Sequence, residues 1–155
     1  MTAAIRPTDG ESMARAAKQE LRCVLVDDSE PVLDALETML GQEAIEVVGR
    51  AETGVEALRV LEALPTTFVV LDLRLPDMDG LEVARRAAEI LLRKTAVILY
   101  TTWAAPSEIR DILAAGVRAI VIKDVPPANL LTAIGETAAG RVYLDPRLSP
   151  AKEGV

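Results

Sequence analysis

The alternation of short apolar runs with amphipathic stretches limits the folds open to this chain more than any other feature. Five runs rich in leucine and β-branched residues occur at residues 21–26, 45–48, 67–71, 96–100 and 119–122. Stretches of about 10–13 residues with helical periodicity separate them. Continuous apolar runs are typical of strands buried on both faces of a sheet, and intervening helices connect such strands in parallel. The sequence therefore predicts an α/β fold: a doubly wound, five-stranded parallel sheet with helices on both faces.

The same pattern divides the chain into three parts. The 155 residues are enough for one domain with a core and too few for two ordinary ones. Residues 1–20 are polar and alanine-rich without periodicity, which predicts a flexible N-terminal extension. Residues 21–140 carry the pattern and are predicted to be the folded domain. Residues 141–155 lose it, as a C-terminal tail or linker stub would.

Composition excludes several classes of function. The formal net charge is −7 and no cluster of Lys and Arg stands out, so we expect no direct nucleic-acid binding by this segment. The chain has no histidine, which excludes His-based triads and the usual zinc sites. Its single cysteine, Cys23, lies in an apolar run and cannot form a disulfide within the chain. Apolar stretches fall short of the roughly 18 residues that cross a membrane, and no signal segment is present. We expect a cytoplasmic protein without membrane contact.

Polar residues follow the predicted strands, where ligands bind in open α/β sheets. These residues are Asp27, Asp28, Asp72, Thr101, Thr102 and Lys123. Each alone has an ordinary explanation, such as helix capping or exposure to solvent, but together they indicate one site. Two carboxylates about 5 Å apart repel by roughly 3 kcal/mol at an effective dielectric constant of about 20. The cluster therefore needs a cation, and oxygen ligands without His or Cys favour Mg²⁺.

Four segments carry a resemblance to a known family. They are residues 24–28 (VLVDD), 71–80 (LDLRLPDMDG), 100–102 (YTT) and 122–124 (IKD). In this order and spacing they resemble the response regulator receiver (CheY-like) domain, over about residues 21–140. Residues 114–124 and 138–140 are similar to the NarL/FixJ-like (LuxR-type) branch, here without its C-terminal helix-turn-helix. The resemblance implies a flavodoxin-like sheet with strand order 2-1-3-4-5.

The family resemblance implies a phosphoacceptor switch in two-component signal transduction rather than a conventional enzyme. Asp72 would accept a phosphoryl group from a histidine kinase, which must act in trans because this chain has no histidine. Lys123 and Thr101 would bind oxygens of that phosphoryl group, and slow self-dephosphorylation would follow from the same chemistry.

The implied metal site uses oxygen ligands from two of the strand ends. Asp28 and Asp72 would hold Mg²⁺ directly and Asp27 mainly through water. The backbone carbonyl of Arg74 would supply a further oxygen.

The implied switch begins at Thr101 and extends through Thr102 and Trp103. Receivers often carry Tyr or Phe three residues before the conserved lysine, where this chain has Ile120. Lys123 is followed by Asp124 instead of the frequent proline. Output would be a shift between two surface states, reported by the fourth helix, fifth strand and fifth helix. A homodimer is compatible with this scheme, with its face unspecified.

Three other interpretations predict different residues or a different mechanism. A haloacid-dehalogenase-like phosphatase would need an aspartate two residues after the nucleophile, where this chain has Arg74. A nucleotide-binding Rossmann domain would need a glycine-rich first turn, but residues 27–30 are acidic. The third alternative, a receiver-like scaffold that acts without phosphorylation, stays open because of Ile120. Both a stand-alone regulator and part of a transcription factor are compatible with the main interpretation.

Overall fold

The computed structural model describes residues 21–90, 95–124 and 127–148. The predicted extension at residues 1–20 lies outside these ranges, as do residues 149–155 of the predicted tail. The described strands follow the apolar runs of the sequence. They are β1 (Arg22–Val26), β2 (Glu46–Ala51), β3 (Phe68–Leu71), β4 (Ala96–Thr101), β5 (Val117–Ile122) and β6 (Tyr143–Leu144).

These strands form one sheet in the order β2-β1-β3-β4-β5-β6, and every neighbouring pair is parallel. The predicted α/β fold and strand order 2-1-3-4-5 are therefore confirmed. The sheet has six strands rather than five, because β6 joins the edge of β5 within the stretch predicted as a tail. A strand of two residues is too short to show a period of its own.

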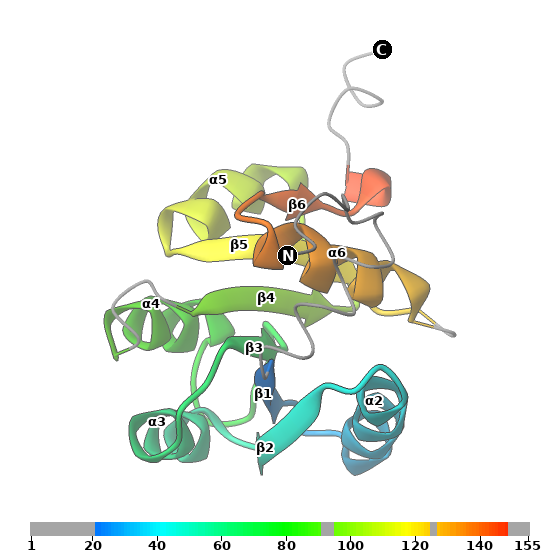
Figure 1. Ribbon diagram of the computed structural model, residues 1–155. Helices are drawn as coiled ribbons and strands as arrows, with labels where there is room; N and C mark the ends of the chain where they lie inside the picture. Colours follow the sequence, from blue (N-terminus) through cyan, green and yellow to red (C-terminus); the bar gives the residue numbers. More distant parts are fainter. Residues whose placement is uncertain (1–20, 91–94, 125–126, 149–155) are drawn as a thin grey trace, which may run out of the picture.

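Helices connect the strands and cover both faces of the sheet (Figure 1). They are α2 (Glu30–Gln42), α3 (Gly54–Ala63), α4 (Gly80–Ile90), α5 (Pro106–Ala114) and α6 (Ala128–Ala138), with a 3₁₀ helix, η1 (Pro146–Leu148). In Figure 1, α3, α4 and α5 lie on one face, and α2 and α6 lie on the other. In the described part of the chain, every helix is too short or too polar to span a membrane.

Local residues fix where these helices begin and end. Ser29 caps α2 by accepting a hydrogen bond from the Val32 amide, and Thr53 caps α3 through the Glu56 amide. Gly116 follows α5 with a φ of +103°, a conformation that favours glycine and turns the chain into β5. These fixed helix ends determine where the neighbouring strands begin and end.

The core consists of two hydrophobic clusters, one on each face of the sheet. Along β1, Val24 and Val26 face the cluster under α3–α5, and Cys23 and Leu25 face the cluster under α2 and α6. Cys23 is fully buried, and burial raises the pKa of its thiol. With both faces covered, the open positions for polar chemistry are the loops beyond the strand ends.

Candidate functional site

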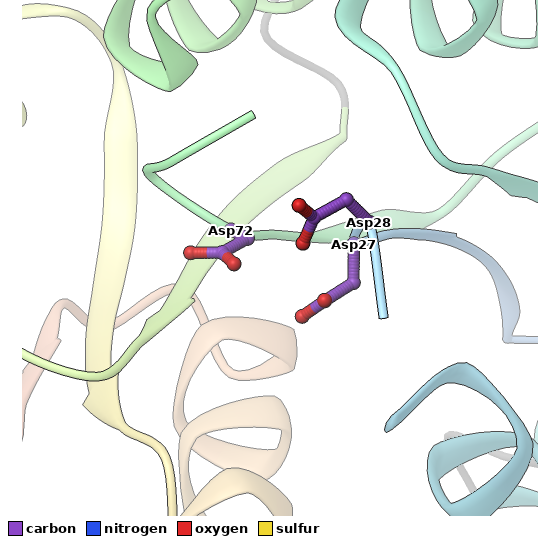
Figure 2. A group of neighbouring side chains, drawn as sticks. All are labelled: Asp27, Asp28 and Asp72. Atoms are coloured by element: carbon purple, nitrogen blue, oxygen red, sulfur yellow. The ribbon is translucent and has the colours of Figure 1, made fainter. Parts of the chain in front are cut away.

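Three carboxylates gather where β1 and β3 end. Asp27 and Asp28 directly follow β1, Asp72 directly follows β3, and the two strands are parallel neighbours. One oxygen from each side chain lies within 4.8 Å of an oxygen of the others. Figure 2 shows the three side chains grouped at this edge of the sheet. The structure thus brings together the three predicted metal-ligand side chains.

Asp27 is held almost entirely out of solvent. Its side chain accepts a hydrogen bond from the Ser29 amide at 2.9 Å, and its own amide donates to the Ala51 carbonyl at 3.0 Å. Burial raises the pKa of Asp27, and the hydrogen bonds from Lys123 and Ser29 oppose that rise. The carboxylate is therefore an oxygen ligand of fixed position.

The ammonium of Lys123 bridges two of the carboxylates. Its Nζ lies 2.7 Å from Asp27 Oδ2 and 2.9 Å from Asp72 Oδ2. Burial acts to lower the pKa of Lys123, but the hydrogen bonds to the two carboxylates outweigh it and the pKa is raised. Lys123 is thus a cation at this site and offsets part of the repulsion between the carboxylates.

The loop after Asp72 is fixed by backbone contacts. The Asp72 amide donates to the Val26 carbonyl at 3.0 Å, and the Arg74 amide donates to Asp72 Oδ1 at 3.2 Å. The Gly80 amide donates to the Leu73 carbonyl at 2.8 Å. A side chain at Gly80 would place its Cβ 2.6 Å from the Asp72 carbonyl oxygen, so only glycine lets the loop fold back this closely.

Thr101 is the last residue of β4 and is completely buried. Its Oγ1 has no hydrogen-bond partner among the described residues, whereas its carbonyl accepts the Lys123 amide at 2.7 Å. Burying a hydroxyl without a hydrogen-bond partner lowers the stability of the fold by about 1–3 kcal/mol, so the presence of threonine at this position needs an explanation. A ligand oxygen bound at this edge of the sheet would supply one.

The remaining predicted switch residues are not gathered at the cluster. Thr102 is exposed, and Trp103 is 57% exposed in the loop after β4. Ile120 lies in the middle of β5, fully buried in the cluster under α3–α5. The Arg74 side chain is exposed. Trp103 therefore lies on the surface, and Ile120 lies in the core.

The sequence analysis missed a second polar group close to Lys123. Asp145 is 1% exposed and accepts a hydrogen bond from the Ile122 amide at 2.9 Å. Arg147 bonds to Asp145 and also to the carboxylate of Asp124. The signal that points to this group is the apolar stretch at residues 142–144 followed by Asp-Pro, which lies in the segment predicted to be a tail.

The chemistry of the donor set suits a small divalent cation. Three carboxylates and one ammonium give a formal charge of −2, which one divalent ion balances. Oxygen ligands at parallel strand ends are typical of Mg²⁺ sites that also use water and phosphate oxygens. The residues present therefore fit such an ion.

Comparison with known proteins agrees with this geometry. The response regulator receiver domain family matches residues 23–135. The chain is 35% identical to the transcriptional regulatory protein YhcZ of Bacillus subtilis over 112 residues, covering 72% of this chain and 52% of that protein. It is 33% identical to the DNA-binding transcriptional activator DevR/DosR of Mycobacterium tuberculosis over 132 residues, covering 84% and 60%. The chain thus spans between half and two thirds of the length of these relatives.

Solved structures show the same likeness. A LuxR-family two-component response regulator from Aurantimonas superposes with a TM-score of 0.80 at 27% identity, covering 87% of this chain and 98% of the other. A CheY-like receiver domain protein from Methanospirillum hungatei gives a TM-score of 0.72 at 30% identity, covering 78% and 95%. The acidic cluster, the bridging lysine and the buried threonine occupy the strand ends of a receiver fold. This chain belongs to the response regulator receiver domain family.

Proposed function

We propose that this chain is switched by a phosphoryl group on Asp72, transferred from a phosphohistidine of a histidine kinase. Receiver domains of this family accept phosphoryl groups from histidine kinases. The observation that supports the proposal most is the Lys123 ammonium, which bridges Asp27 and Asp72. The unpaired hydroxyl belongs to Thr101, whose carbonyl accepts the Lys123 amide. Together these groups supply a nucleophile, a cation and a hydrogen-bond donor.

In the proposed transfer, a carboxylate oxygen of Asp72 attacks the phosphorus of the phosphohistidine. The new P–O bond forms as the P–N bond breaks, and the imidazole nitrogen keeps the electron pair of that bond. Lys123 Nζ already lies 2.9 Å from Asp72 Oδ2, so it can pair with a phosphoryl oxygen with little movement. The Thr101 hydroxyl donates to another phosphoryl oxygen. In self-dephosphorylation, water attacks the phosphorus of the aspartyl phosphate, the P–O bond to Asp72 breaks, and inorganic phosphate leaves as the carboxylate is restored.

Mg²⁺ is the proposed cofactor. Asp28 and Asp72 would hold it directly and Asp27 mainly through water, with the Arg74 carbonyl as a further oxygen ligand. When bound, it would neutralise charge on the phosphoryl oxygens. Receiver domains bind Mg²⁺ at an acidic pocket of this kind.

The proposed output is a surface change that begins at Thr101. Movement of its hydroxyl toward the phosphoryl group would shift Thr102 and Trp103 in the next loop, and the face of α5, β5 and α6 would report it. Ile120 lies within β5 under that face, where its packing against the α3–α5 cluster would adjust. The surface would control a partner or an attached output domain, and a homodimer is one such partner.

The experiment is phosphorylation by acetyl phosphate, followed by intact mass. The wild type should gain one phosphoryl group only when Mg²⁺ is present, and Asp72→Asn should gain none. Asp34→Asn, which removes an exposed carboxylate on α2, is the matched control and should behave as wild type. A gain that survives Asp72→Asn would place the acceptor elsewhere.

The scaffold alternative predicts a different result. Neither acetyl phosphate nor a panel of histidine kinases would then add a phosphoryl group to the wild type. The complete set of charged groups at the site gives that alternative no support.

A further inference from the structure

Asp145 is a buried acid outside the proposed phosphorylation site. It is 1% exposed and has a partner for each carboxylate oxygen. Oδ2 accepts hydrogen bonds from the Ile122 amide at 2.9 Å and from Arg147 Nη2 at 2.7 Å, and Oδ1 accepts one from Arg147 Nε at 2.9 Å. Burial alone would raise the pKa of Asp145, but these hydrogen bonds lower it to about 2. The carboxylate is therefore a charged anchor within the fold.

Arg147 extends this anchor to both sides of Ile122. Its Nη2 donates to the Ile122 carbonyl at 3.3 Å, and its Nη1 lies 3.1 Å from Asp124 Oδ2. Asp145 holds the amide of the same residue, Ile122. The residues immediately before and after Lys123 are thus bound by one arginine, and the Ile122 carbonyl that it contacts belongs to the peptide bond leading into Lys123.

The opposite side of Lys123 is held by β4. The Lys123 amide donates to the Thr101 carbonyl at 2.7 Å, and the Tyr100 hydroxyl lies 3.3 Å from the Asp124 carbonyl oxygen. Among the described residues, neither Arg147 nor Asp145 forms a hydrogen bond or ion pair with the Lys123 side chain. Any influence they have on its ammonium must therefore pass through the backbone of residues 122–124.

The short strand β6 cannot fix this geometry by itself. It contributes two residues, and Leu144 is 38% exposed. Leu148, by contrast, packs in the core cluster under α3–α5. The segment 143–148 therefore contacts the sheet through β6 at its start and the core through Leu148 at its end. Between these points, the Asp145 amide donates to the Ile120 carbonyl at 2.8 Å, and the side chains of Asp145 and Arg147 bind the end of β5 that leads into Lys123.

We propose that Asp145 and Arg147 are positioning residues for Lys123. They hold the end of β5 so that the Lys123 ammonium meets Asp27 and Asp72, and the segment 143–148 is a working part of the phosphorylation site. The inference rests on the proposed function for its catalytic consequence, but its structural content is independent of it. Since a displacement of about 1 Å in a reacting group can slow a reaction about 100-fold, a partial loss of positioning should slow phosphorylation about tenfold.

The first test measures the backbone at Lys123 without phosphorylation. Amide exchange by NMR is followed in wild type, Arg147→Gln and the control Arg86→Gln, which breaks an exposed ion pair with Glu82 on α4. We expect exchange at the Lys123 amide to accelerate about tenfold in Arg147→Gln only, with Val70 in β3 unchanged. Unchanged exchange at Lys123 in Arg147→Gln would overturn the proposal whatever the phosphorylation result.

The second test is a double-mutant cycle on the phosphorylation rate with acetyl phosphate and Mg²⁺. Arg147→Gln should slow the wild type about tenfold and should have no further effect in a Lys123→Met background, because it acts through that lysine. Arg147→Lys should recover part of the rate. Equal slowing in both backgrounds would mean a general loss of stability and would overturn the positioning role. Absence of phosphorylation in the wild type would instead contradict the proposed function and leave the exchange test decisive.

Discussion

Lys123 and Asp72 are 51 positions apart in the sequence, yet Lys123 Nζ lies 2.9 Å from Asp72 Oδ2. The contact joins the ends of β3 and β5, which are separated by β4 in the sheet. The pair is largely enclosed, with 19% of the Lys123 side chain and 7% of the Asp72 side chain exposed. Such a pair keeps the proposed phosphoryl acceptor and its neighbouring cation together before any phosphoryl group is bound.

Replacement of the ammonium should expose the repulsion that it offsets. We expect Lys123→Met to lower the free energy of unfolding by about 1–3 kcal/mol, since a buried charge that loses its partner is costly and this site is partly open to water. Because the site then carries one more net negative charge, added Mg²⁺ should stabilise the variant more than the wild type. Thermal unfolding with and without Mg²⁺ measures both effects. An equal Mg²⁺ shift in the two proteins would contradict this account.

Removal of the Thr101 hydroxyl should separate stability from function. Thr101→Val deletes a buried polar atom that has no partner among the described residues, so we expect the free energy of unfolding to rise by about 1 kcal/mol. Binding of beryllium fluoride with Mg²⁺, a stand-in for the phosphoryl group on Asp72, should weaken. The single tryptophan, Trp103, reports that binding by fluorescence.

Thr95→Val is the matched control for that substitution. The Thr95 hydroxyl donates to the Thr66 carbonyl at 2.6 Å, so its loss should lower stability by about 1 kcal/mol and leave beryllium fluoride binding unchanged. If Thr101→Val destabilised the protein as much as Thr95→Val does, the Thr101 hydroxyl would have a partner in the folded state.

The loop after Asp72 should tolerate no side chain at Gly80. An added Cβ would lie 2.6 Å from the Asp72 carbonyl oxygen, and the atoms it meets are backbone. We expect Gly80→Ala to cost about 1–3 kcal/mol in unfolding free energy by urea denaturation. Gly41→Ala is the contrast: apart from its own stretch of α2, no described atom lies within 4 Å of the new methyl group, so a gain of up to about 1 kcal/mol is expected. Equal effects at both positions would contradict the steric argument.

Acid should weaken the anchor at Asp145. The folded pKa of Asp145, about 2, lies below the ordinary aspartate value of 3.8, so the carboxylate stabilises the fold above pH 4 and loses that contribution as pH falls toward 2. Asp145→Asn should therefore be less stable than wild type by up to about 2 kcal/mol at neutral pH, and the difference should vanish near pH 2. Urea unfolding at several pH values measures it. A difference that stays constant with pH would mean that the charge of Asp145 is not what stabilises the segment.

The alternation of apolar runs and helical stretches was sufficient to predict the parallel sheet, because strands buried on both faces must be apolar throughout. The polar residues at the strand ends were equally visible, since parallel strands bring their carboxyl ends to one edge. Asp27, Asp28, Asp72 and Lys123 could therefore be grouped from the sequence alone.

Tertiary structure alone decided how these groups pair and what surrounds them. That Lys123 bridges Asp27 and Asp72, and that the Thr101 hydroxyl is sealed in without a partner, follows from packing between segments far apart in the chain. The sixth strand and the burial of Asp145 were missed for the same reason. A strand of two residues shows no periodicity. An aspartate followed by proline is typical of a turn, and only the tertiary structure shows that Arg147 and the Ile122 amide bind the Asp145 carboxylate.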